Sequence, residues 1–594
     1  MQSHKVIYQK PVFFLVFILV AFSLYAAPHR GDYFQLQQPD KSRVTVRVWG
    51  DEFYQDVEGI DGYTLVRDSS SGWICYAELS SEGNEYLSTG IIYRLFIPEN
   101  DSSAMPGTGT SFMKQGTQGL EQHLRINQQS MQKKAFDNKQ ILTQAAISTN
   151  EPPRIALDFQ PAPPKTKSLS GTITGLTLLV DFPDQKALVT KNQVQAFCNQ
   201  EGYSSRYANG SVRDWFYEVS NGKLIYENIV TDVITVSKVK SYYDANCEYC
   251  KVPELINEAL TKLRESGFDF SPLSTKDGYF TAINVLYAGE PSMGWAKGLW
   301  PHQGWLNGSF SVNGIKARVY QLTDLGDSFS TELFTFTHEN GHMVCGWDDL
   351  YAYDNHDKGL GYWDSGSNRS NPSIPNPYFL HLLDWIDVTD ITGLVNGSFD
   401  LVSNSRQACM YHGGNNEVFY LESVRRSGRN ANLPGEGMLI WHVYTEGKNT
   451  YSNETNLVSL EQADGRFDLE NSANNGDAND SFRAGYRDSF NDSTRPSATW
   501  YTKQASGLDV NSISAVGDIM SFKIGTGGPL IETGDVNEDA VVNILDALLI
   551  AQFYVNLEPE NFNPRFADVN NDGGITIVDA LLIARFYVGL IPGF

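Results

Sequence analysis

The sequence predicts a multidomain α+β protein, and three observations support this fold class. Its 594 residues exceed the usual length of a single domain. Strand-like alternation near the N-terminus gives way to mixed strand and helix periods, and short alternating strands return after about residue 391. The C-terminal part repeats an acidic loop followed by an apolar, helix-like segment. We therefore expect several domains, ending in a small α-helical one.

Composition excludes two classes of partner. The formal net charge is −25, from 45 Lys and Arg against 70 Asp and Glu residues. Because nucleic-acid-binding proteins present a basic surface, we expect no nucleic-acid partner. The longest apolar run, residues 12–22, is shorter than the about 20 residues that a membrane-spanning helix needs. We therefore expect no membrane span once the N-terminal segment is removed.

The N-terminal segment has the pattern of a bacterial-type export signal. Lys5 and Lys10 precede the apolar run, and the small residue Ala26 follows it. We assign residues 1–26 to a signal peptide, with an uncleaved anchor as the alternative. The protein is then expected to be secreted, extracellular or associated with the cell surface. Export makes the six cysteines candidates for disulfides, but their pairing is not assigned.

Residues 27–168 predict a propeptide-like β-rich domain and a linker. Short alternating runs are separated by Asp-Gly and Ser-Gly turns over residues 28–95. A Gln- and Lys-rich stretch at about 114–144 predicts an exposed helix, and a Pro-rich stretch at 151–171 predicts an extended linker. A folded unit, a helix and an exposed stretch are the layout of a propeptide with a processing site. An ordinary accessory domain is the alternative.

Two larger regions follow the linker. Residues 169–390 begin with a buried strand, TGLTLLVDF, and show helix signals at 212–220 and 252–265. Residues 391–526 contain short strands such as EVFYLESV and GMLIWHVY, which predict a β-sandwich-like domain. A Gly-rich linker at 524–534 separates it from the C-terminal repeat.

The strongest chemical signal is an H-E-x-x-H motif made by His338, Glu339 and His342. On an α-helix, positions i and i+4 share a face, so both imidazoles can bind one Zn²⁺ ion. Glu339 is then placed to accept a proton from an attacking water. A catalytic zinc needs a third protein ligand. From spacing alone, Asp348, Asp349 and His356 all remain possible.

The region around this motif resembles the secreted bacterial zinc metalloproteases of the immune inhibitor A type. The resemblance extends over about residues 30–525, and the segments that carry it are HENGHMVCGWDDLYAYD at 338–354, QPDKSRVTVRVWGDEF at 38–53, GLTLLVDFPD at 175–184, GSVRDWFYEVSNGKL at 210–224 and GEGMLIWHV at 435–443. It implies a zincin-type catalytic domain at 169–390 and endopeptidase activity. It also implies His338 and His342 as zinc ligands and Glu339 as general base. Asp349 matches the acid of the family's Pro-Asp-x-Tyr, with Asp348 as the alternative ligand.

The chain departs from related enzymes at one place that bears on activity. Their methionine-containing turn beneath the metal is missing, because no Met lies between Met343 and Met410. The stretch at 359–372 stands in its place. An alternative function is therefore a scaffold-borne binding protein with a catalytically inactive zincin fold. Farther along, Asp477 and Asp480, with Asp464 and Asp468 upstream, could bind a structural Ca²⁺ ion through oxygen atoms.

The C-terminal repeat has the spacing of calcium-binding loops. Two 23-residue segments start at Asp535 and Asp568, 33 residues apart, and 15 of their positions are identical. Each begins D-x-N-x-D and has an Asp at loop position 12, a spacing that wraps oxygen ligands around Ca²⁺. The predicted ligands are Asp535, Asn537, Asp539 and Asp546 in the first loop, and Asp568, Asn570, Asp572 and Asp579 in the second.

With one helix after each loop, residues 532–594 resemble a dockerin module. The resemblance implies a cohesin-bearing scaffold or cell-surface protein as partner. The apolar pairs Ile544-Leu545 and Ile577-Val578 lie in the region that dockerins use for recognition. A free-standing calcium-folded tail is the alternative.

Overall fold

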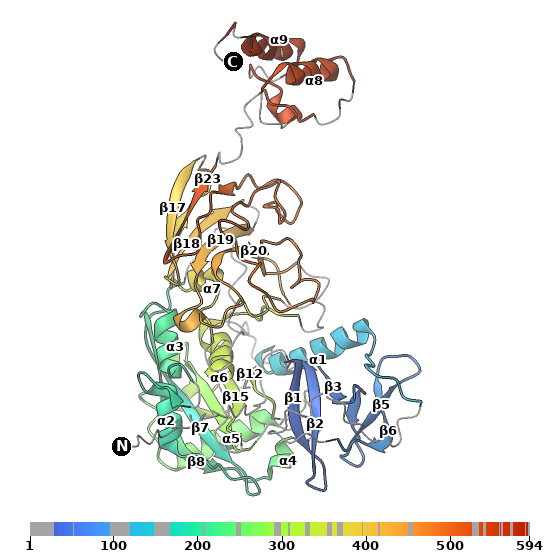
Figure 1. The fold of residues 1–594 in the computed structure, drawn as a ribbon. Coiled ribbons are helices and arrows are strands. Elements are labelled where there is room, and N and C mark those ends of the chain that lie inside the picture. The colour runs from blue at the N-terminus through green and yellow to red at the C-terminus, as the bar shows by residue number, and fades with distance from the viewer. Residues whose placement is uncertain are drawn as a thin grey trace, which may run out of the picture.

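The structure is a computed structural model in which the arrangement of most of the chain is defined (Figure 1). It describes residues 29–51, 53–95, 119–147, 167–205, 208–244, 251–289, 299–306, 309–326, 333–352, 359–364, 372–394, 396–413, 416–449, 455–525, 534–537, 542–557, 559, 562–570, 574–588 and 590–591. The predicted signal peptide at 1–26 lies outside these residues, as do His356 and the predicted loop ligands Asp539 and Asp572.

The N-terminal region forms two three-stranded antiparallel sheets, as its alternating pattern predicts. The strands are β1 (His29–Gln37), β2 (Arg43–Gly50) and β3 (Gln55–Gly59) in one sheet, and β4 (Leu65–Arg67), β5 (Ile74–Leu79) and β6 (Tyr86–Ile92) in the other. Val44, Val46 and Val48 are buried, because alternate residues of β2 point to the same side.

Helix α1 (Gln128–Ile147) follows these sheets and begins later than the predicted helix at 114–144. Met131 and Ala135, one turn apart, are buried, so the prediction of an exposed helix holds for only part of its surface. The helix contacts strand β12 (His302–Trp305) of the next region. The N-terminal region is therefore packed against the part of the chain that follows the predicted linker.

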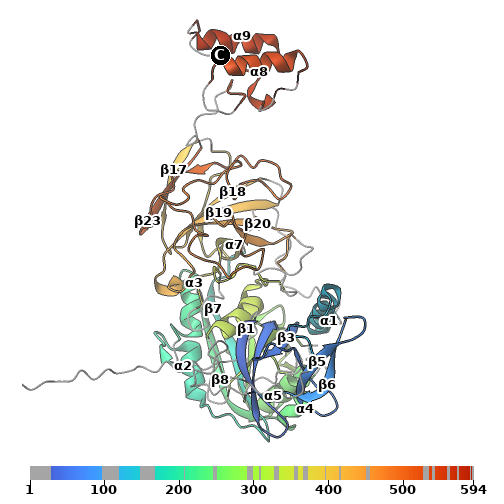
Figure 2. The same ribbon diagram turned by 45° about the vertical axis from the view of Figure 1, so that its right-hand side comes forward.

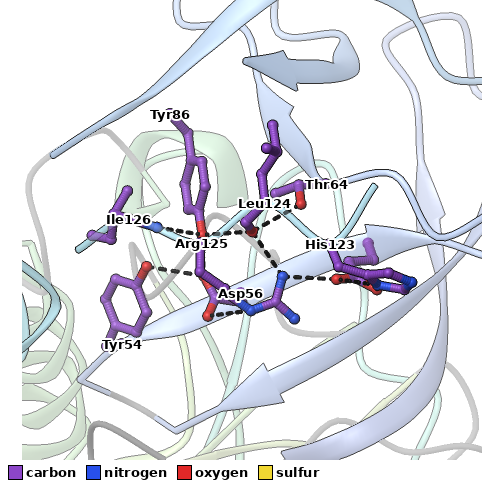
Figure 3. A network of polar contacts seen from close by, with 9 residues as sticks. Tyr54, Asp56, Thr64, Tyr86, His123, Leu124, Arg125 and Ile126 are labelled. Carbon is purple, nitrogen blue, oxygen red and sulfur yellow. Dashed lines mark hydrogen bonds and ion pairs between the residues drawn. The ribbon is translucent and has the colours of Figure 1, made fainter. Parts of the chain in front are cut away.

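A buried polar network holds the segment before α1 (Figure 3). Arg125 lies between two acidic side chains, with Nε 3.2 Å from Asp56 Oδ2 and Nη1 2.7 Å from Glu58 Oε1. Tyr54 and Tyr86 donate hydrogen bonds to Asp56 Oδ1 at 2.9 and 2.7 Å. Burial raises the pKa of Asp56, although Arg125 and both tyrosines favour its charged form. This network fixes the start of α1 relative to β3.

The central region is built on a five-stranded sheet in the order β12-β15-β11-β7-β8. Strands β7 (Gly171–Asp181), β8 (Leu224–Thr235), β11 (Ile283–Tyr287) and β15 (Val319–Asp324) are parallel, and β12 is antiparallel at one edge. The short strands β9 (Thr275–Lys276), β10 (Tyr279–Phe280), β13 (Ser311–Val312) and β14 (Ile315–Lys316) form a separate small sheet.

Both faces of the central sheet are covered, which explains the continuous apolar run of β7. On one face, Leu176 and Leu178 share a core with helix α5 (Val252–Glu265) and with the N-terminal sheets. On the other face, Leu179 shares a core with the remaining helices of this layer, α2 (Lys191–Asn199), α3 (Val212–Val219) and α6 (Leu333–Asn340). The helices predicted at 212–220 and 252–265 are confirmed as α3 and α5. A short helix α4 (Lys240–Tyr243) precedes α5.

The next region consists of two packed sheets. The larger sheet, in the order β16-β18-β19-β20-β21, contains β16 (Asp387–Asp390), β18 (Gln407–His412), β19 (Glu417–Val424), β20 (Gly437–Tyr444) and β21 (Val458–Leu460). The smaller sheet contains β17 (Gly397–Val402), β22 (Val510–Asn511) and β23 (Ile519–Ile524). A 3-10 turn, η4 (Gly428–Asn430), joins β19 to β20.

Residues of β19 are buried on both sides of the larger sheet. Phe419 and Leu421 face the smaller sheet, whereas Val418 and Tyr420 belong to the core that contains α3 and α6. Strand β16 precedes residue 391 but pairs in parallel with β18. The β-rich region therefore begins a few residues earlier than the change in sequence pattern indicates.

The C-terminal region has its own small core and two helices that pack against each other (Figure 2). Helix α8 (Ile544–Tyr554) and helix α9 (Ile577–Tyr587) occupy equivalent positions in the two repeats, and a 3-10 turn, η5 (Pro564–Phe566), lies between them. Val536, Ile550, Val569 and Ile583 form the centre of the core.

The cysteines that the structure describes are not paired in disulfides, although export made them candidates. Cys75, Cys198, Cys345 and Cys409 are buried free thiols. Burial raises the pKa of each thiol, so these cysteines behave as small apolar core residues. Cys247 and Cys250 lie outside the described residues. Within the described parts of the chain, no helix combines the length and the apolar character that crossing a membrane requires.

Candidate metal centre

The H-E-x-x-H motif lies where an α-helix changes its winding. Helix α6 ends at Asn340, and the chain continues as a π-turn, η3 (Gly341–Cys345), which Gly346 ends with φ 75°. The spacing of the motif predicts one uninterrupted α-helix, and the structure differs from this prediction. Both imidazoles still lie on one side, with their ring centroids 4.6 Å apart and their Nε2 atoms 3.1 Å apart. A π-turn of this kind is frequent at functional sites.

The left-handed Gly346 turns the chain back and brings Asp349 to the two histidines. Asp349 Oδ1 lies 3.4 Å from His338 Nε2 and 3.1 Å from His342 Nε2. A tetrahedral zinc with bonds of about 2.0–2.1 Å separates its ligand atoms by about 3.3–3.4 Å. The three side chains therefore have the donor types and the spacing that a Zn²⁺ ion needs. Asp348, the alternative ligand, is exposed to solvent.

The three groups are largely buried and strongly coupled. Burial would lower the pKa of His342, but the Asp349 carboxylate raises it to about 10. Burial also lowers the pKa of His338, and the neighbouring His342 adds to this effect. Burial would raise the pKa of Asp349, but His342 and the hydrogen bonds from both histidines hold it well below its usual value. The Asp349 carboxylate therefore stays charged beside the imidazole nitrogens of His338 and His342.

Glu339 is buried beside this cluster, with 1% of its surface exposed. Its Oε1 atom accepts no hydrogen bond from the described residues. Burial, aided by the charge of Asp349, raises the pKa of Glu339 to about 8, although His342 and the backbone of Gln303 on strand β12 act to lower it. A buried carboxylate with one oxygen unpaired is costly for folding, so its presence calls for a functional explanation.

The orientation of His342 is fixed by the turn that follows it. His342 Nδ1 is 2.6 Å from the carbonyl oxygen of Trp347, to which the ring N–H donates. In the neutral form that binds a metal, this bond leaves the lone pair of Nε2 toward Asp349 and His338. The indole of Trp347 stacks on Phe379 at 5.5 Å and meets Trp385 edge-on at 5.8 Å.

Aromatic side chains thus support the π-turn in a chain that lacks the methionine-containing turn. Phe379 belongs to helix α7 (Pro377–Leu382). Gly341 is needed for this packing, since an added Cβ would lie only 3.0 Å from the Trp347 ring. Sequence reasoning missed this support, although a dense set of aromatic residues after the motif was visible.

A second missed feature is a polar network that anchors the end of α6 to the sheet. Asn340 accepts a hydrogen bond from the Tyr226 hydroxyl at 2.7 Å and donates one to Asn284 Oδ1 at 3.0 Å. Asn284 in turn donates to Asn228 Oδ1 at 2.8 Å. All members are buried, and Asn228 Nδ2 is the one side-chain atom among them without a partner in the described residues, so the network fixes the helix that carries His338 and Glu339. The visible signal was the presence of Asn228 and Asn284 in otherwise apolar strands.

The two C-terminal loops have nearly the same geometry. Asp546 Oδ1 accepts backbone hydrogen bonds from Val536 and Asn537, and Asp579 Oδ1 accepts them from Val569 and Asn570. The second oxygen of each carboxylate accepts from the N-cap residue of the following helix, Asn543 or Thr576. Position 12 of each loop therefore joins the start of the loop to the helix. As calcium ligands, Asp535, Asn537, Asp546, Asp568, Asn570 and Asp579 stay predictions.

Comparison with known families identifies this C-terminal part. Residues 533–586 match the dockerin type I domain. A search of curated proteins finds no match to the chain. The protein is therefore a mixed α/β chain that carries a C-terminal dockerin. Dockerin domains bind calcium and attach proteins to cohesin-bearing partners, and proteins that carry them are typically extracellular or associated with the cell surface.

Proposed function

We propose that this chain is a secreted zinc-dependent endopeptidase that hydrolyses peptide bonds of extracellular proteins and is tethered through its dockerin. One observation carries the proposal. Three ligand atoms from His338, His342 and Asp349 converge at spacings suited to zinc, beside the buried carboxylate of Glu339, whose Oε1 atom is unpaired among the described residues. The sequence resemblance to immune inhibitor A-type proteases supports the same assignment.

The chain's own groups account for the proton transfers of peptide hydrolysis. A zinc ion held by the three ligands would supply Lewis-acid polarisation of the substrate carbonyl and a more acidic water. Glu339 Oε1 accepts the proton of the attacking water and then passes it to the leaving amine. Because Glu339 Oε1 accepts no hydrogen bond from the described residues, this oxygen is available for both transfers.

The position of β12 favours an extended peptide as substrate. This strand is the antiparallel edge of the central sheet, and the backbone of its residue Gln303 lies near Glu339. An edge strand offers unpaired backbone groups to which a peptide can add. Helix α1 of the N-terminal region contacts the same strand. This contact supports the proposal that the N-terminal region is a propeptide that keeps the enzyme a zymogen.

The C-terminal helices support attachment to an apolar partner surface. Ile544 and Leu545 at the start of α8 are 51% and 46% exposed, and Ile577 and Val578 at the start of α9 are 48% and 47% exposed. Exposed aliphatic pairs at equivalent positions of a repeat are typical of a recognition surface. We propose that these pairs contact a cohesin-type partner.

The test compares casein hydrolysis by the full-length chain and by its Glu339→Gln variant. Each is assayed before and after limited trypsin cleavage, with trypsin then inhibited; Arg154, Lys165 and Lys167 offer cleavage sites in the Pro-rich stretch. We expect the Glu339→Gln variant to lose activity by about 10²–10⁴-fold while keeping its zinc. Glu254→Gln, an exposed change of the same chemistry on α5, is the matched control and should retain full activity.

Casein hydrolysis by the zinc-bound chain separates this proposal from the alternative function. If the cleaved wild-type chain binds zinc but hydrolyses no casein, the endopeptidase proposal is wrong. A scaffold-borne binding protein with an inactive zincin fold would then explain the chain better.

A further inference from the structure

A second group of acidic side chains converges in the β-rich region, in the long connection after β21. Asp464, Asp477 and Asp480 each place one carboxylate oxygen within 4.8 Å of the others. Asp480 is fully buried, and the side chain of Asp464 is only 4% exposed. Three carboxylates at this separation repel one another strongly unless a cation lies between them.

In this group, one oxygen of each carboxylate accepts a hydrogen bond from a backbone amide of the loop. Asp464 Oδ1 accepts a hydrogen bond from the Arg466 amide at 2.9 Å, and Asp477 Oδ1 accepts one from the Asn479 amide at 2.7 Å. Asp480 Oδ2 accepts from the Asp477 amide at 2.8 Å and from the indole N–H of Trp363 at 2.7 Å. The backbone thus fixes the direction of all three side chains, as preformed metal sites require.

The second oxygens are poorly satisfied. Asp480 Oδ1 is buried and accepts no hydrogen bond from any described residue. Asp477 Oδ2 accepts one hydrogen bond, from Asn474 Nδ2 at 3.2 Å. Asp464 Oδ2 is buried, accepts no hydrogen bond from any described residue, and lies 3.6 Å from Nε of Arg466, whose side chain is 66% exposed. Burial, aided by the charges of Asp477 and Asp464, raises the pKa of Asp480 to about 6. A buried oxygen without a donor points to a missing positive ligand.

We propose that Asp464, Asp477 and Asp480 form a binding site for a calcium-type divalent cation. All three donors are carboxylate oxygens, which hard cations such as Ca²⁺ prefer, and water would complete its shell. The site differs from the candidate zinc centre, where two of the three donors are imidazole nitrogens. It is also separate from the dockerin loops, and it does not depend on the proposed peptidase activity.

The proposed cation would fasten this loop to the segment that follows the candidate zinc centre. Besides the bond between Trp363 and Asp480, the Tyr362 amide donates to the Asn475 carbonyl at 2.8 Å. Gly476 has φ 96°, and an added Cβ would lie 2.6 Å from the Trp363 indole nitrogen. The backbone is thus packed directly on Trp363. Removing the cation should loosen the contact between this loop and residues 360–364.

Tb³⁺ luminescence tests the proposal in the full-length, zinc-saturated chain. Tb³⁺ replaces Ca²⁺ in oxygen sites and emits when a nearby tryptophan is excited, and Trp363 is bonded to Asp480. The dockerin does not contribute to this signal, because residues 532–594 contain no Trp. We expect tryptophan-sensitised emission that added Ca²⁺ abolishes by competition. If the wild-type chain shows no such emission, the proposal is wrong.

Substitutions locate the signal. Asp464→Asn combined with Asp477→Asn leaves the bond from Trp363 to Asp480 intact and should weaken Tb³⁺ binding by more than about ten-fold, since affinity follows the ligand charge. Asp468→Asn is the matched control, because Asp468 contacts Asn474 but lies outside the cluster. It should bind Tb³⁺ like the wild type. Equal binding by the double variant and the wild type would overturn the proposal, and near-ultraviolet circular dichroism checks that each variant is folded.

Discussion

Two buried histidine–carboxylate clusters in this chain differ in how completely their polar atoms are paired. In the β-rich region, His442 lies between two glutamates, with Nε2 3.0 Å from Glu417 and Nδ1 3.1 Å from Glu461. Tyr501 stacks on its ring at 4.2 Å, and the Tyr501 amide donates to Glu417 at 2.7 Å. In the candidate metal centre, three donor atoms instead face one another, and Glu339 keeps an unpaired oxygen among the described residues.

This difference distinguishes a structural cluster from a candidate reactive one. At His442 each ring nitrogen pairs with a separate carboxylate, so both nitrogens are satisfied. These pairs connect β19 and β20 to the residue after β21. At His338 and His342 both rings turn toward the same carboxylate, which is poor pairing for a folded protein but suitable for a shared metal ion. The direction in which the ring nitrogens of a histidine point therefore indicates its role better than its burial does.

The largest expected effect tests which acid completes the candidate zinc centre. Asp349→Ala should weaken zinc binding by more than about 100-fold, beyond the range for residues that only support a ligand. Asp348→Ala is the matched control and should keep zinc, because that side chain is exposed. Zinc content after dialysis against a weak chelator measures both variants. Loss of zinc from Asp348→Ala alone would assign the third ligand to Asp348.

A smaller effect is expected for stability, from the same substitution in each cluster. Glu417→Gln should lower the free energy of unfolding by about 1.5–3 kcal/mol, because it removes the charge from a buried hydrogen bond to His442. Glu339→Gln should be neutral or stabilising, since it removes a buried charge whose Oε1 atom accepts no hydrogen bond from the described residues. Differential scanning calorimetry of the zinc-saturated full-length chain compares the two. A larger loss in Glu339→Gln would contradict the comparison.

The smallest expected effect is the pH dependence that His442 contributes to stability. Burial would lower the pKa of His442, but its bonds to Glu417 and Glu461 raise it above the usual 6.5. Because the folded state binds this proton more tightly than the unfolded state, the charged ring stabilises the fold, and its full contribution is present below pH 6.5. The contribution is lost as the pH rises through the pKa of His442 in the folded state. The slope is at most about 1.4 kcal/mol per pH unit.

The control for this pH dependence is the His442→Gln variant, which lacks the titrating ring. Unfolding of wild type and variant is followed at several pH values above 6.5, and the difference isolates His442. We expect the stability of the variant to fall less as the pH rises. Parallel curves would show that the pairing of His442 with its two glutamates does not stabilise the charged ring.

Local patterns allowed much of the fold to be predicted. Helices α3 and α5 and the strands β7, β19 and β20 were evident because their periods and caps involve neighbouring residues. The start of the β-rich region was harder, since β16 pairs in parallel with β18, a choice that depends on packing. Export made the cysteines candidates for disulfides, but each of the four described ones is buried as a free thiol.

The sequence by itself was enough to identify the two histidines of the candidate zinc centre, the glutamate between them and the repeated calcium-type loops of the dockerin. These features have short, regular spacings, so the backbone geometry within one turn or loop brings them together. Only the tertiary structure decided that Asp349, and not Asp348, faces His338 and His342, because the left-handed Gly346 reverses the chain there. It also placed Trp363 against Asp480 across 117 residues. Contacts at that separation depend on how whole sheets pack, which no local pattern records.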